Sequence, residues 1–171
     1  MKSIVKKFSI PDEIAKIAET LENKGFEAYL VGGCVRDLLL GKKPRDWDIT
    51  TNAAPEKIQE VFKDSFYENE YGTVGVVTSN TNDETLKVVE VTPYRREGAY
   101  SDKRRPDTIA FGGTLQDDLK RRDFTINAIV LRLIRETKTG EYEAEIENCY
   151  EGQADLEKKI VRTVGNPEER F

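Results

Sequence analysis

The stretch from Leu30 to Thr51 constrains the fold of this chain most, because strand, turn and helix patterns follow one another within a short length. The apolar segment 28–31 predicts a short strand that ends at the glycine pair 32–33. Residues 35–40 predict an amphipathic turn of helix that stops at the next glycine. After a polar loop, residues 46–49 predict a second strand. The pattern therefore places a glycine turn beside a polar strand.

Two acidic residues on that second strand, Asp46 and Asp48, form an acid pair. Residues i and i+2 of a strand point to one face, so both carboxylates should aim at the same spot. Hard oxygen ligands there suit a divalent cation that also holds phosphate oxygens. Gly32 and Gly33 carry no Cβ, which lets backbone amides approach a phosphate closely. A plain tight turn and a surface-exposed acid pair are the alternatives for each motif alone, but together the motifs predict a nucleoside triphosphate site.

Further charged residues are candidates for the same site. Arg36 could reach a phosphate with its forked donor set, or it could form a surface ion pair. Arg122 and Asp123 follow a basic helix end and could bind a ribose or phosphate, with a solvated charge run as the alternative. Glu90 alternates with apolar residues on an expected strand. It is therefore a candidate third carboxylate, with an edge-strand or loop position as the alternative.

The absence of histidine excludes several kinds of catalysis on this chain. A Ser/His triad, histidine metal ligands and His/Asp phosphohydrolase chemistry all require it. The content of 37% hydrophobic and 35% charged residues indicates a single core, and the net charge of −5 argues against an all-over nucleic-acid coat. No apolar run approaches the ~20 residues of a membrane span. The 2 cysteines are too few for a disulfide framework, so a reducing, cytoplasmic location is expected.

The rest of the chain mixes strand and helix patterns without a steady βαβ rhythm. This favours an α+β fold, with a small mixed β-sheet flanked by helices, over a doubly wound fold. Asn52 is expected to cap a helix with Pro55 in its first turn, and Thr114 to cap another. Residues 95–107, which are basic and broken by glycine and proline, predict a mobile loop. Further helices are expected at 11–24 and 153–159, strands at 65–68, 73–78, 86–92, 143–150 and 161–164, and a strand or buried helix within 124–133.

Several segments together resemble the class II tRNA nucleotidyltransferases and bacterial poly(A) polymerases, a branch of the polymerase-β nucleotidyltransferases. The matching segments are Gly32–Gly41, Asp46–Ile49, Gly98–Asp107, Arg121–Ala128 and Arg162–Pro167. The resemblance covers nearly the whole chain, from about Phe26 to Phe171. It implies a polymerase-β-type head and a reaction in which the 3′ hydroxyl of an RNA attacks the α-phosphate of CTP or ATP.

The resemblance also implies a role for each candidate residue. Gly33 and Arg36 would contact the incoming triphosphate. Arg122 would bind the nucleotide, and Asp123 would help to recognise its ribose. The acid pair would hold two Mg²⁺ ions. The segment 95–107 resembles the flexible element that helps the family to switch from C addition to A addition.

One departure from the family bears on the domain layout. In the family, the chain continues into a helical neck whose Glu-Asp-x-x-Arg motif chooses C or A, and this sequence stops at Phe171 before such a motif. We therefore expect a catalytic head over residues 1–150, with 151–171 as the end of the head and the start of a truncated neck. The expected function is template-independent addition of CMP and AMP to the 3′ end of tRNA.

Three alternatives to this function stay open at the level of sequence. A poly(A) polymerase would use the same chemistry with ATP only. A nucleotide-binding piece without turnover would bind CTP or ATP but lack the neck needed for addition. A sugar-nucleotide glycosyltransferase also uses Asp-x-Asp, but it leaves the segment 121–125 without an explanation.

Overall fold

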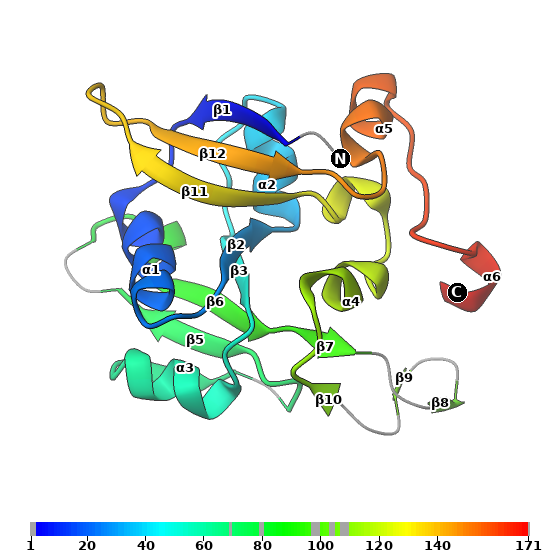
Figure 1. The fold of residues 1–171 in the computed structure, drawn as a ribbon, viewed down its shortest axis with the longest axis horizontal. Helices are drawn as coiled ribbons and strands as arrows, with labels where there is room; N and C mark the ends of the chain where they lie inside the picture. Colours follow the sequence, from blue (N-terminus) through cyan, green and yellow to red (C-terminus); the bar gives the residue numbers. More distant parts are fainter. Residues whose placement is uncertain are drawn as a thin grey trace.

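The computed structural model of this chain describes residues 3–68, 70–78, 81–96, 100–102, 105–106 and 110–170. Its centre is an eight-stranded sheet in the order β1-β12-β11-β2-β3-β6-β5-β4 (Figure 1). Neighbouring strands are antiparallel except β3 and β6, which run parallel. The strands are β1 (Ile4–Phe8), β2 (Ala28–Val31), β3 (Asp48–Thr51), β4 (Ser65–Tyr67), β5 (Val74–Val77), β6 (Val88–Pro93), β11 (Val130–Glu136) and β12 (Tyr142–Glu147). The expected α+β fold with a mixed sheet is confirmed, and the sheet is larger than the sequence suggested.

Helices and short strand pairs surround this sheet. The helices are α1 (Asp12–Asn23), α2 (Gly33–Leu39), α3 (Pro55–Val61), α4 (Leu115–Lys120), α5 (Gly152–Lys158) and α6 (Pro167–Arg170), with 3₁₀ turns η1 (Glu84–Leu86) and η2 (Thr125–Asn127). Two small antiparallel pairs join β7 (Arg95–Arg96) to β10 (Ala110–Phe111) and β8 (Tyr100–Asp102) to β9 (Arg105–Pro106). Within the described ranges, no helix combines the length and apolar character needed to cross a membrane.

Two hydrophobic clusters cover opposite faces of the sheet. The larger cluster packs α1, through Ile14 and Leu21, against Leu30 of β2. The smaller cluster packs Leu119 of α4 against Val31, the next residue of the same strand. Successive residues of a strand point to opposite faces, so one strand supplies both clusters. In Figure 1, α1 and α3 accordingly lie to the left of the central strands and α4 lies to the right.

The same alternation aims the acidic end of β3 toward α4. Ile49 belongs to the larger cluster. Its neighbours Asp48 and Thr50 therefore point to the opposite face. The Thr50 hydroxyl donates a hydrogen bond to the carboxylate of Asp118 in α4, at 3.4 Å. Asp48 thus opens onto the face of the sheet that α4 partly covers.

Several local expectations need correction. The cap of α3 is Ala54, and Asn52 instead accepts a hydrogen bond from the Glu27 amide at 2.8 Å. The segment 161–164 is not a strand, because it forms only an isolated bridge between Thr163 and Phe124. Ile4–Phe8 forms a strand that the sequence reading did not identify. Of the mobile loop expected at 95–107, residues 97–99, 103–104 and 107 lie outside the described residues, and the described parts form the short strands β7, β8 and β9.

Candidate active site

Carboxylates from neighbouring strands meet at one end of the sheet. Asp48 opens β3 and is paired in register with Glu90 of the parallel strand β6. Their carboxyl groups are within hydrogen-bonding reach of each other. Glu90 in turn shares a hydrogen bond with Glu68, which follows β4. Glu90 therefore lies beside Asp48, and its part in holding a metal stays a prediction. Glu68 is an addition that the sequence did not reveal.

Burial and mutual repulsion disfavour the charged forms of these acids. Burial raises the pKa of Asp48, and the charges of Asp46 and Glu68 raise it further, against the lowering effects of the Glu90 hydrogen bond and the Arg122 charge. The hydrogen bond that Glu90 donates to Asp48, followed by burial, raises the pKa of Glu90. A cluster of this kind gains stability when a cation neutralises it.

Asp46 lies differently from the sequence expectation. The strand begins at Asp48, so Asp46 precedes β3 and is exposed. Pairing extends slightly beyond the strand, because the Glu90 amide donates a hydrogen bond to the Trp47 carbonyl at 3.3 Å. The charge of Asp46 still raises the pKa of both Asp48 and Glu90. The acid pair therefore remains close in space, although Asp46 is not a strand residue.

The glycine turn lies directly beside Asp48, as the sequence predicted. Gly32 has a φ of 82°, a conformation that L side chains rarely adopt. A Cβ added there would lie 3.6 Å from Asp48 Oδ2 and 3.9 Å from Arg122 Nη1. The glycine turn, the Asp48 carboxylate and the Arg122 guanidinium therefore lie next to one another. Gly33 follows as the first residue of α2, and a Cβ there would lie 3.3 Å from Arg36 Nη2.

A chain of hydrogen bonds joins Arg36 to Asp123. Arg36 Nη1 donates to Asn127 Oδ1 at 3.2 Å, and Asn127 Nδ2 donates to Asp123 Oδ1, also at 3.2 Å. Asp123 Oδ1 also accepts a hydrogen bond from the Phe124 amide at 2.6 Å. Asn127 is therefore a site residue that sequence reasoning missed. The available signal was its place in the segment 121–128, which was singled out without a role for this side chain.

Arg122 is held on one side and open on the other. Its Nη2 donates to Asp118 Oδ2 at 3.1 Å, and its side chain is 18% exposed. Its Nε is buried without a hydrogen-bond partner. The guanidinium thus has unused donor capacity next to Gly32 and Asp48. Asp118 was not among the residues predicted from the sequence.

The carboxylate oxygens at this site form a partial ligand set, which suits magnesium, and not a closed metal cage made of protein ligands alone. Among the described residues, no group of three or more His, Cys, Asp or Glu side chains is arranged to hold a metal ion by itself. Mg²⁺ is usually held by one or two carboxylates, with water and substrate phosphates completing its shell. Asp48, with Asp46 nearby, offers such a partial set of oxygens beside the glycine turn.

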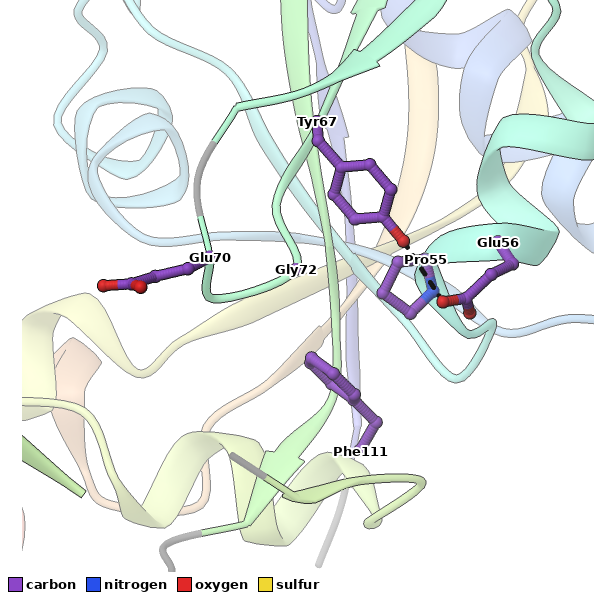
Figure 2. A pocket seen from close by; sticks show the side chains of 6 residues that line it. All are labelled: Pro55, Glu56, Tyr67, Glu70, Gly72 and Phe111. Carbon is purple, nitrogen blue, oxygen red and sulfur yellow. Dashed lines mark hydrogen bonds between the residues drawn. The ribbon is translucent and has the colours of Figure 1, made fainter. Parts of the chain in front are cut away.

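A hollow of about 440 Å³ is lined by other residues (Figure 2). Figure 2 shows Phe111 facing Gly72 and Pro55, and the Tyr67 hydroxyl donates a hydrogen bond to Glu56 at 3.2 Å. None of the predicted site residues lines this hollow. It is therefore not the site indicated by the acid pair and the glycine turn.

Comparisons with known proteins identify relatives that match most of this chain. The CCA-adding enzyme of Lactobacillus helveticus is 42% identical over 98% of the chain. The CCA-adding enzyme of Oceanobacillus iheyensis is 44% identical over 91% of the chain. The chain spans only 39% and 35% of their lengths. The crystal structure of the Bacillus stearothermophilus CCA-adding enzyme in complex with CTP matches this chain with a TM-score of 0.73 and 35% sequence identity. The match covers 94% of this chain and 35% of the length of that enzyme.

A family model matches the greater part of the chain. The model describes the poly A polymerase head domain, and the match covers residues 28–162. The matched range includes the glycine turn, the acid pair and the segment 121–128. The chain therefore belongs to the poly A polymerase head domain family.

Proposed function

We propose that this chain is the catalytic head of a CCA-adding tRNA nucleotidyltransferase, which adds CMP and AMP to the 3′ end of tRNA. The observation that carries the proposal is that the side chains of Asp48 and Arg122 both lie next to Gly32. Relatives named CCA-adding enzymes match nearly the whole chain. Residues 1–150 form the catalytic head, and residues 151–171 complete it and begin the neck. The family match over residues 28–162 supports only the assignment of residues 151–162 to the end of the head.

The proposed roles divide between cation-holding and anion-holding residues. Asp46 and Asp48 hold Mg²⁺, with Glu90 as the neighbouring third carboxylate. Mg²⁺ held there would supply a lower pKa for the attacking 3′ hydroxyl and a counter-charge for the triphosphate. Gly32 and Gly33 leave room for the triphosphate to approach the backbone, because a Cβ at Gly32 would occupy the space between Asp48 and Arg122.

The cationic residues bind and orient the nucleotide. Arg36 and Arg122 donate to phosphate oxygens, and Asp123, held by Asn127, accepts from the ribose. In the reaction, the 3′ oxygen of the RNA bonds to the α-phosphorus as the bond to pyrophosphate breaks, and the hydroxyl proton passes to solvent water. The residues contribute mainly by positioning and by stabilising charge.

The proposed substrates are CTP, ATP and the 3′ end of tRNA. Solved relatives include a tRNA nucleotidyltransferase complexed with a primer tRNA and an incoming ATP analog, at 26% identity and a TM-score of 0.60. The proposed location is the cytoplasm, in line with the free Cys34 and Cys149 thiols.

Alanine substitution of the acid pair tests the proposal. Asp46→Ala and Asp48→Ala should each lower CMP incorporation into tRNA lacking its 3′ CCA by ~1,000-fold or more, because a metal ligand contributes several kcal/mol to the transition state. Both variants should remain folded by circular dichroism. The matched control is Asp64→Ala, at an exposed aspartate that has no proposed role, and it should keep full activity.

The outcomes separate the candidate functions. Incorporation from CTP alone supports CCA addition, whereas extension with ATP only would replace it with poly(A) polymerase activity. A thermal shift with Mg²⁺ and nucleotide, but no incorporation, would indicate a binding piece without turnover. An active double alanine variant would rule out the proposed metal site.

A further inference from the structure

The contacts of one buried carboxylate point to a further residue of the site. We propose that Asp118 is a positioning residue that fixes Arg122 at the glycine turn and keeps it away from Asp48. The inference rests on the proposed function, because it concerns how the same site receives its nucleotide. Asp118 does not touch the nucleotide in this proposal, and it acts through Arg122.

Asp118 is fully buried and satisfied from several elements. Its side chain is 0% exposed. Oδ1 accepts hydrogen bonds from Arg121 Nη2 at 2.9 Å and Nε at 3.2 Å, and from the Arg95 amide at 3.3 Å. Oδ2 accepts from Arg122 Nη2 at 3.1 Å and from Thr50 Oγ1 at 3.4 Å. One carboxylate therefore ties α4 to β7 and to β3, the strand of Asp48.

The charge around Asp118 favours its ionised form. Burial raises the pKa of its carboxyl, but the nearby Arg122 and Arg121 guanidiniums outweigh burial and leave the pKa below its ordinary value. Burial, followed by the charge of Arg121, lowers the pKa of Arg95 to about 10. Cations thus outnumber this single anion, which leaves positive charge available to a phosphate group.

The way Arg122 is held determines what it can bind. Asp118 takes Nη2, and Nη1 remains on the side of Gly32. Arg122 also lies near enough to Asp48 to lower the pKa of that carboxyl. Without Asp118, the Asp48 carboxylate is therefore an anion close enough to attract Arg122. Arg122 would then pair with Asp48, the acid that should hold the metal. The site would lose a cation for the phosphates and a carboxylate for the metal at the same time.

Asp118→Asn tests this role, because the amide keeps the shape of the side chain and removes its charge. The KM for CTP in CMP incorporation should rise by ~10-fold or more, since a buried hydrogen bond to a charged group is lost. The same loss should appear in CTP binding measured by thermal shift. In an Arg122→Gln background, Asp118→Asn should have no further effect on KM, because the residue through which it acts is absent.

Asp117→Asn is the matched control. Asp117 lies beside Asp118 on α4, and its Oδ2 accepts hydrogen bonds from the Thr114 amide at 2.8 Å and from the Thr114 hydroxyl at 3.1 Å. Its loss should lower the unfolding temperature without raising the KM for CTP. If Asp118 had a purely structural role, Asp118→Asn would likewise lower the unfolding temperature without raising the KM for CTP. The difference in KM between the two variants therefore decides the question.

Each outcome supports or overturns the inference. A KM rise in Asp118→Asn that disappears in the Arg122→Gln background supports it, and an unchanged KM or an additive effect overturns it. If Asp118→Asn does not fold, Thr50→Val carries the test, because it removes the second donor to Oδ2 and should cause a smaller, Arg122-dependent rise. An unsubstituted chain that does not transfer CMP overturns the proposed function, and the inference falls with it.

Discussion

At the scale of single residues, Gly32 has the most demanding position in the site. Its φ of 82° and ψ of −144° lie close to a region that essentially only glycine adopts. An added Cβ would also lie 3.6 Å from Asp48 Oδ2. Backbone strain and proximity to the acid therefore coincide at one residue.

Gly32→Ala should damage stability and activity separately. The backbone strain should lower the free energy of unfolding by about 1–3 kcal/mol. CMP incorporation should fall further than this loss explains, because the new methyl group faces the proposed metal and triphosphate. Urea unfolding and initial rates of incorporation measure the two effects.

Gly25→Ala is the matched control for that substitution. Gly25 has a φ of 88°, and an added Cβ would meet nothing within 4 Å. This variant should lose stability through backbone strain while its folded fraction keeps full activity. Equal activity in the two folded variants would contradict the role given to Gly32.

At the scale of elements, α5 holds the segment 121–128 from outside. Gly152, the first residue of α5, is buried, and a Cβ there would overlap the backbone oxygen of Thr125 in η2. The Thr125 hydroxyl also donates a hydrogen bond to Asp155 of α5 at 2.7 Å. Since η2 carries Asn127, the packing of α5 supports the residue that links Arg36 to Asp123.

Gly152→Ala should therefore displace η2. The expected loss is about 1–3 kcal/mol of unfolding free energy, as for other overpacked sites, with a parallel fall in nucleotide affinity. Gly140→Ala serves as the control, because a Cβ there would meet nothing within 4 Å and the φ of 84° adds only backbone strain. If Gly152→Ala binds CTP as tightly as Gly140→Ala does, α5 has no part in shaping the site.

At the scale of the whole molecule, the sheet collects acids that are far apart in the sequence. Asp48 lies in β3, Glu90 lies in β6, and Glu68 follows β4 at the edge of the sheet. Burial and like charges raise the pKa of Asp48, so folding brings these acids together at a cost. A divalent cation would offset that cost in the folded state only.

Magnesium should accordingly stabilise the chain against heat. With a Kd of about 1 mM, 10 mM Mg²⁺ adds ~1.4 kcal/mol by mass action, which corresponds to a rise in unfolding temperature of roughly 3–6 °C. EDTA should remove the shift. Asp48→Asn should show no shift, and in EDTA it should be at least as stable as the unsubstituted chain. Sodium chloride at matched ionic strength controls for screening, and a full Mg²⁺ shift in Asp48→Asn would contradict this account.

Local patterns predicted much of the fold and part of the site. Thr114 was expected to cap a helix, and it forms a capping box with Asp117 at the start of α4. The glycine turn was expected beside Asp48, and it lies there. The prediction for Asn52 was wrong, because its side chain accepts a hydrogen bond from the amide of Glu27, in a distant segment, and does not cap α3. A cap preference is local, and a tertiary hydrogen bond can override it.

The sequence alone indicated the proposed chemistry, because glycines, acids and arginines at fixed short spacings predict a triphosphate site. Only the tertiary structure decided which side chains support it. Asp118 meets Arg95 and Thr50, and Asn127 meets Arg36, through contacts between segments far apart in the chain. The physical reason is that spacing along a strand or helix fixes neighbours a few residues apart. Neighbours across a sheet depend on strand order and register, which arise when the whole chain packs.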